Sequence, residues 1–136
     1  MAKLIWILKD HWQTMLQDVS RQAPLEACGL VAGLGNRSQA VYPITNELRS
    51  PVNYRMAPRE QYEAFINIEQ NNWELLAIYH SHPAGPEGPS PTDVAEFAYP
   101  GTLSIIWRQD AAGWNCRAYQ IIDGKVDQIT IQVCKS

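Results

Sequence analysis

Hydrophobic and polar positions along the chain follow two repeating patterns, one typical of strands and one typical of helices. Short apolar or alternating runs predict β-strands, and these runs cover residues 3–8, 27–34, 38–45, 53–56, 75–79, 103–107, 116–122 and 126–133. Apolar residues three and four positions apart predict helices over 10–22 and 58–71, and a shorter helix is expected over 91–98. This order predicts an α/β (α+β) domain in which helices flank a mixed, largely antiparallel, curved sheet.

Length and charge restrict the function as well as the fold. The 136 residues, 46% of them hydrophobic, suffice for one compact core and are too few for two ordinary domains, so we expect a single domain over 1–136. The net charge of −3 and the pI near 5.5 argue against a nucleic-acid surface, which needs clustered positive charge. The apolar run at 4–8 is too short to span a membrane, and we expect a cytoplasmic protein without a membrane partner.

The three cysteines carry little functional signal. Cys28, Cys116 and Cys134 are odd in number and show no C-x-x-C spacing. They therefore suit neither a disulfide framework nor a sulfur-ligated zinc site. We expect buried free thiols, which are the common state of cysteines in a reducing compartment.

The segment His80-Ser81-His82-Pro83 places two imidazoles at the end of an apolar run. Side chains two residues apart on a strand share one face and lie about 6.6 Å apart along its axis, a span that one metal ion can bridge. Across a Gly/Pro loop, the segment from Ser90 to Asp93 adds a hydroxyl and a carboxylate. Two imidazoles and one carboxylate leave a fourth position on zinc for water, which is typical of a catalytic site.

Ser90 and Asp93 also have a purely structural interpretation. Ser-x-x-Asp is a common helix start, in which the hydroxyl caps the helix and the acid suits its first turn. One hydroxyl can cap a helix and also donate to a substrate, so the two interpretations are compatible for Ser90. The position of this segment after the histidine pair favours the ligand interpretation for Asp93.

Hydrolysis at such a site needs a further carboxylate that takes up and returns protons. Glu26 is the best candidate, because it opens the apolar run 27–34, where an acid needs a reason to be present. An ordinary charge at the edge of a strand explains Glu26 equally well, since burial cannot be read from a sequence. Glu87, in the loop beside the expected metal, is the competing acid.

Together these residues resemble the JAMM (MPN+) metallopeptidase family, whose pattern is a distant Glu, then His-x-His-Pro, six residues, and Ser-x-x-Asp. The chain matches every position of this pattern. Segments 28–30, 43–46 and 54–58 are also similar to the family's connecting segments. The resemblance implies an MPN-type, cytidine-deaminase-like fold. It further implies Zn²⁺ as the cofactor, with the ligands and catalytic residues at these positions: His80, His82 and Asp93 for the metal, Glu26 as general acid/base, and Ser90 for the oxyanion.

The resemblance also implies a reaction and a partner. Compact prokaryotic members of the family process sulfur-carrier proteins, so we expect a zinc-dependent peptidase or isopeptidase. Its expected substrate is the bond after the C-terminal glycine of a ubiquitin-like or sulfur-carrier protein, including the release of cysteine from a carrier adduct. The expected partner is therefore the C-terminal tail of such a protein.

Other functions fit parts of the sequence. The metal motif of cupin-type enzymes also begins with His-x-His followed by a Glu, here Glu87. That motif needs a further histidine on a later strand. The remaining histidine, His11, lies on a predicted helix near the other end of the chain. Zinc deaminases need a Pro-Cys-x-x-Cys segment that the chain lacks. A non-catalytic MPN-type module that binds ubiquitin-like proteins is the main alternative, although the complete ligand set argues against it.

Overall fold

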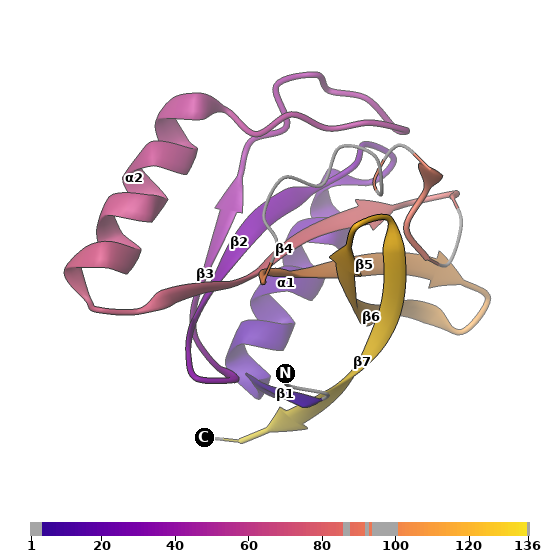
Figure 1. The fold of residues 1–136 in the computed structure, drawn as a ribbon. Helices are drawn as coiled ribbons and strands as arrows, with labels where there is room; N and C mark the ends of the chain where they lie inside the picture. Colours follow the sequence, from indigo (N-terminus) through magenta and orange to yellow (C-terminus); the bar gives the residue numbers. More distant parts are fainter. Residues whose placement is uncertain (1–3, 86–87, 92, 94–100, 136) are drawn as a thin grey trace.

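The computed structural model describes residues 4–85, 88–91, 93 and 101–135. Seven strands and two helices lie within these residues (Figure 1). In chain order they are β1 (Leu4–Leu8), α1 (Lys9–Gln22), β2 (Cys28–Leu34), β3 (Arg37–Ile44), α2 (Pro58–Gln70), β4 (Glu74–His82), β5 (Leu103–Asp110), β6 (Gly113–Ile122) and β7 (Lys125–Cys134).

The strands form one sheet in the order β1-β3-β2-β4-β5-β6-β7, and β7 pairs with β1 to close it into a barrel. Both parallel and antiparallel pairings occur, and the antiparallel ones are in the majority, as predicted. The closure between β1 and β3 rests on a single register pair, Trp6 with Arg37. Helix α1 packs across both strands at this weak point.

Each face of the sheet buries its own apolar cluster. Met15 and Val19 of α1 pack into the larger cluster, which also contains the fully buried Tyr79 and Trp107. The second cluster lies on the α2 side, where Ala64 packs with residues of β2 and β4. Each large apolar side chain buried in this way stabilises the fold by about 1.5–3 kcal/mol. The central strands are consequently covered on both faces, which gives them a rigid setting for functional side chains.

Gly29 of β2 leaves room for a large side chain on the paired strand β4. Its register partner is Tyr79, and a Cβ atom at position 29 would lie 2.3 Å from the Tyr79 ring. Every other amino acid would therefore push the aromatic ring out of place. The glycine accommodates the Tyr79 ring on the α1 face of β4, and the alternation of the strand places the neighbouring His80 on the opposite face.

Most predicted elements are confirmed, but one strand is wrong. Residues 53–56 form no strand, and only Met56 makes an isolated bridge with Asn46. The Asn53 carbonyl and the Arg55 amide bind the Asn46 side chain, and the Arg55 carbonyl accepts from the Glu47 amide. The predicted hairpin turn at Asp123 and Gly124 is confirmed, and both residues have the positive φ that such a turn requires.

Three further expectations concern the third helix, the cysteines and the membrane. The helix expected over 91–98 lies largely outside the described residues. All three cysteines are free thiols, with Cys28 fully buried and the other two partly buried. In the part of the chain that the structure describes, no helix has the length and hydrophobicity needed to cross a lipid bilayer.

Candidate metal centre

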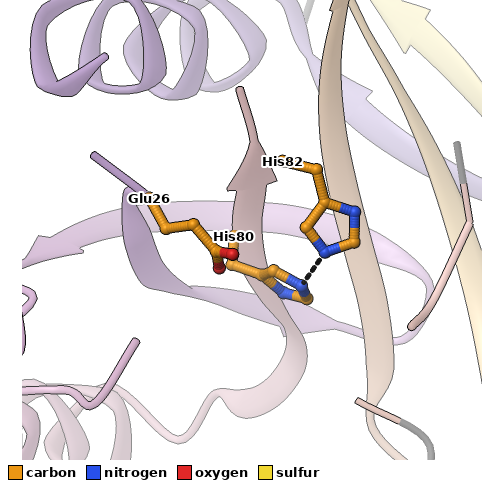
Figure 2. Close-up of side chains that lie close together, drawn as sticks. All are labelled: Glu26, His80 and His82. Atoms are coloured by element: carbon orange, nitrogen blue, oxygen red, sulfur yellow. Dashed lines mark hydrogen bonds between the residues drawn. The ribbon is translucent and has the colours of Figure 1, made fainter. Parts of the chain in front are cut away.

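Strand β4 carries both histidines of the motif to one face of the sheet. It pairs with β2 on one side and with β5 on the other, so its backbone is held at both edges. The His80 and His82 side chains are almost completely buried, with 2% and 5% of their surface exposed. Their Nε2 atoms lie 3.1 Å apart (Figure 2). Two ring nitrogens that converge in this way in the interior can share one cation.

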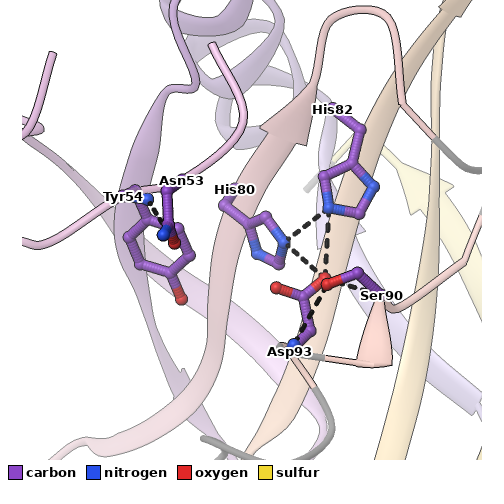
Figure 3. A network of polar contacts seen from close by, with 6 residues as sticks. All are labelled: Asn53, Tyr54, His80, His82, Ser90 and Asp93. Carbon is purple, nitrogen blue, oxygen red and sulfur yellow. Dashed lines mark hydrogen bonds and ion pairs between the residues drawn. The ribbon is translucent and has the colours of Figure 1, made fainter. Parts of the chain in front are cut away.

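Asp93 brings a carboxylate oxygen to the same point. Its Oδ2 atom lies 3.1 Å from Nε2 of His82 and 3.3 Å from Nε2 of His80 (Figure 3). Ser90 holds this carboxylate, because the Ser90 amide donates to Oδ2 at 2.8 Å and the Asp93 amide donates to Ser90 Oγ at 3.1 Å. This reciprocal pair is a capping box. Both sequence interpretations of the segment therefore apply, since the cap aims the carboxylate at the histidines.

The three donor atoms fit a tetrahedral zinc ion. Ligands at about 2.0–2.1 Å from zinc in tetrahedral geometry lie about 3.3 Å from one another. The three observed separations are 3.1, 3.1 and 3.3 Å, so the donor atoms mark one face of such a tetrahedron. Zinc bound through Nε2 also requires the proton of His80 to reside on Nδ1. That atom is buried and has no hydrogen-bond partner among the described residues.

Burial and charge tune these groups in a way that suits metal ligands. Burial lowers the pKa of His80 below its usual value, and the nearby Asp93 only partly opposes this effect. Burial alone would raise the pKa of Asp93, but hydrogen bonds with both imidazoles and the Ser90 amide hold its pKa far below the usual range. Metal ligands must be neutral imidazoles and ionised carboxylates. His80 and Asp93 are both biased toward these forms.

Glu26 lies beside the histidines and is buried, with 5% of its surface exposed. Ligand-capable atoms of Glu26, His80 and His82 all lie within 4.8 Å of one another, and Figure 2 shows the carboxylate turned toward the His80 ring. Burial raises the pKa of Glu26 to about 7; the charge of His82 opposes this rise and that of Asp93 adds to it. A carboxyl group with this pKa can accept and return a proton near neutral pH.

A pocket of about 490 Å³ opens onto this cluster. Glu26, His82 and Ser90 line its polar side. Pro51 and Val52 contribute apolar surface to the same pocket, and Val52 is 80% exposed. A ligand that places apolar groups against Pro51 and Val52 can therefore lie in the pocket with one polar bond near the histidines.

All five residues singled out in the sequence have described positions around this cluster. His80, His82 and Asp93 meet directly, Glu26 is adjacent, and Ser90 holds Asp93. Glu87, the competing acid, lies outside the described residues.

Sequence reasoning gave no role to Tyr54 or Asn46. The Tyr54 ring stacks on His80 with 4.8 Å between centroids and an interplanar angle of 29°. The Asn46 side chain donates to the backbone oxygen of Glu26 at 3.0 Å. Neither residue follows a ligand-like spacing, so only the folded chain reveals their proximity to the site.

Comparison with known proteins identifies the family. The profile of the family described as prokaryotic homologs of the JAB domain matches residues 8–122, a range that includes Glu26, both histidines, Ser90 and Asp93. The chain belongs to this family. The JAMM-type pattern in the sequence is thereby confirmed as a true family resemblance.

This JAB-domain chain has relatives of similar length. It is 33% identical over 130 residues to the CysO-cysteine peptidase of Mycobacterium tuberculosis, covering 93% of this chain and 89% of the relative. It is 38% identical over 88 residues to the desampylase of Pyrococcus furiosus, covering 65% and 63%. A solved structure of a Desulfitobacterium hafniense protein matches with a TM-score of 0.86 and 31% identity, covering 97% of this chain and 94% of that one.

Proposed function

We propose that this protein is a zinc-dependent hydrolase of ubiquitin-like or sulfur-carrier protein conjugates. It cleaves the peptide or isopeptide bond that follows the carrier's C-terminal glycine. The observation that carries the proposal is the convergence of three donor atoms at 3.1–3.3 Å beside a buried carboxyl group, at the side of an open pocket. Two imidazoles and one carboxylate make up a three-ligand catalytic zinc site.

The roles of the residues follow from their positions. His80, His82 and Asp93 would hold the ion, which when bound polarises the scissile carbonyl and lowers the pKa of its water to about 7. Glu26, whose own pKa is about 7, accepts the proton of the attacking water and returns it to the leaving amine. The Ser90 hydroxyl accepts one hydrogen bond from the Asp93 amide, and its own O–H is left to donate to the oxyanion.

The choice of substrate rests on the relatives and on the residues that line the pocket. The names of the two curated relatives refer to a cysteine adduct of the CysO protein and to desampylation. The pocket offers an apolar wall at Pro51 and Val52 next to the reacting groups. A flexible C-terminal tail can enter such a pocket in extended form, with its small terminal glycine at the metal. Cleavage then releases the carrier and a free amine.

The direct test is intact-mass analysis of carrier proteins that bear a single cysteine or a short peptide after the terminal glycine. We expect the zinc-loaded protein to remove the extension, and a chelator to stop the reaction until zinc is restored. The control substrate has the terminal glycine replaced by valine, which should block access of the tail. Stable binding of the carrier without any change of mass would instead identify a non-catalytic module.

A further inference from the structure

The loop over residues 45–57, between β3 and α2, is organised around one side chain. The Asn46 amide group donates to the backbone oxygens of Glu26 and Asn53, each at 3.0 Å. Its oxygen accepts from the amides of Leu48 and Arg55, each at 3.1 Å. The amide group of an asparagine offers two N–H donors and two lone pairs. All four are used here, so Asn46 joins three parts of the loop to Glu26, which lies two residues before β2.

Glu26 depends on this loop for its position. Strand β2 begins at Cys28, so the sheet ladder does not include Glu26. Its amide donates instead to the Ser50 carbonyl at 2.9 Å, and its carbonyl accepts from Asn46. Both backbone polar groups of Glu26 are therefore bonded to the loop. Ala27, the next residue, is bonded to Ser81 of β4, so the loop is the element that holds Glu26 on the side away from the sheet.

The same loop also covers His80. Asn53, whose carbonyl accepts from Asn46, precedes Tyr54, and the Tyr54 ring stacks on the His80 imidazole (Figure 3). Imidazole ligands are usually oriented by a hydrogen bond at the second ring nitrogen. Nδ1 of His80 has no such partner among the described residues, so the stacked ring takes over this orienting role.

We infer that Asn46 is a positioning residue, which fixes Glu26 and the Tyr54 ring relative to each other. Because the Tyr54 ring stacks on His80, Asn46 thereby sets the distance between the Glu26 carboxylate and His80. The inference rests on the proposed function for its catalytic consequence, because Glu26 matters as a base only if the protein is a hydrolase. Pro51 and Val52 belong to the same loop and line the pocket. A substrate bound in the pocket would therefore contact the loop that positions Glu26.

The kinetic test compares Asn46→Asp with Asn36→Asp. The first substitution removes both N–H donors at the loop and sets a carboxylate against the Glu26 carbonyl. The second removes a matched donor, since Asn36 Nδ2 donates to the Leu4 carbonyl at 3.0 Å in the turn between β2 and β3. We expect Asn46→Asp to lower kcat about 10- to 100-fold while KM changes less than about twofold. Zinc content should stay at one equivalent, and Asn36→Asp should match the wild type.

The structural test needs neither zinc nor substrate. Amide hydrogen exchange of the metal-free protein should show Leu48, Arg55 and Glu26 protected in the wild type. In Asn46→Ala all three amides should exchange about tenfold faster or more, and in Asn36→Ala they should not.

The outcomes separate the two proposals. The role of Asn46 would be overturned if Asn46→Asp had the kcat of the wild type, or if the Leu48 and Arg55 amides exchanged without protection in the wild-type protein. Either result would leave the hydrolase proposal intact. A wild-type protein that cleaves no carrier adduct would overturn the hydrolase proposal, while the exchange rates still decide whether Asn46 holds the loop. If Asn46→Ala does not fold, the Asp variant and the wild-type exchange rates are sufficient for the decision.

Discussion

The two faces of β4 use polar residues in opposite ways. On the α1 face, the Tyr79 hydroxyl donates to Asp18 at 2.7 Å, and Ser81 Oγ accepts from the Ala27 amide at 2.8 Å. On the other face, His80 and His82 point their Nε2 atoms at each other and at Asp93, and Nδ1 of His80 has no partner in the described chain. On one face of the strand, therefore, each of these polar groups has a hydrogen-bond partner (the satisfied face). On the other face, the donor atoms point to one common position (the converging face).

The difference shows how a structural polar group can be told from a functional one. A buried polar group that serves stability finds a complementary donor or acceptor, as Tyr79 and Ser81 do. Buried groups that bring several lone pairs to one point lower the stability of the metal-free protein, and this arrangement is explained by a bound cation. Substitutions on the two faces should accordingly change different measured quantities.

The largest effect is expected from Glu26→Gln on the converging face. The amide cannot accept a proton, so turnover of a carrier adduct should fall by about 10²- to 10⁴-fold. Zinc content should not change, because the three ligands remain. Single-turnover cleavage and metal analysis on the same sample provide the measurement. Glu63→Gln, at an exposed position of α2, is the matched control. Undiminished cleavage by Glu26→Gln would mean that another acid, such as Glu87, is the base.

The next effect concerns the stability of the metal-free protein as a function of pH. Burial raises the pKa of Glu26 from 4.5 to about 7, so the folded state binds its proton more tightly than the unfolded state. The stabilisation by this proton is fully present below pH 4.5 and is lost as pH rises through 7. Above pH 7, Glu26→Gln should exceed the wild type by up to about 3 kcal/mol in free energy of unfolding.

Urea unfolding at pH 5 and pH 8 measures this effect. The advantage of Glu26→Gln over the wild type should be larger at pH 8 than at pH 5. Glu63→Gln should show no such dependence. An equal advantage at both pH values would indicate that the Glu26 carboxylate is well solvated.

A smaller effect is expected on the satisfied face. Tyr79→Phe removes the hydroxyl that donates to the partly buried Asp18, which should lower the free energy of unfolding by about 1–2 kcal/mol. The kcat value should not change, since Tyr79 faces away from the histidines. Tyr62→Phe, on the exposed surface of α2, serves as the control. If Tyr79→Phe lost more kcat than its lower stability explains, the two faces of β4 would be coupled.

Local pattern predicted much of this fold. The strands at 75–79 and 103–107 are continuous apolar runs, as is the neighbouring strand at 27–34, so the apolar runs themselves were enough to find them. Residues 53–56 were predicted as a strand, because their composition resembles one. The Asn46 side chain instead binds the Asn53 carbonyl and the Arg55 amide, and a side-chain contact of this kind leaves no periodic signal in the sequence.

The site was predictable to the extent that its residues are close in sequence. His80 and His82 share a strand, and Ser90 and Asp93 share a helix start, so their spacing indicates their chemistry. Glu26 could be named, but its burial and its pKa of about 7 depend on the folded chain. The stacking of Tyr54 on His80 depends on the loop conformation and has no signature in the sequence.

Zinc content of the purified protein and of three ligand variants shows directly whether His80, His82 and Asp93 hold a zinc ion. We expect one zinc per wild-type chain by mass spectrometry of the metal, and less than about a tenth of that in His80→Ala, His82→Ala and Asp93→Asn after dialysis. Glu26→Gln, beside the ligands but not among them, should retain one zinc. Equal zinc in the wild type and all three ligand variants, or none in the wild type after incubation with zinc, would show that these residues do not form a zinc site.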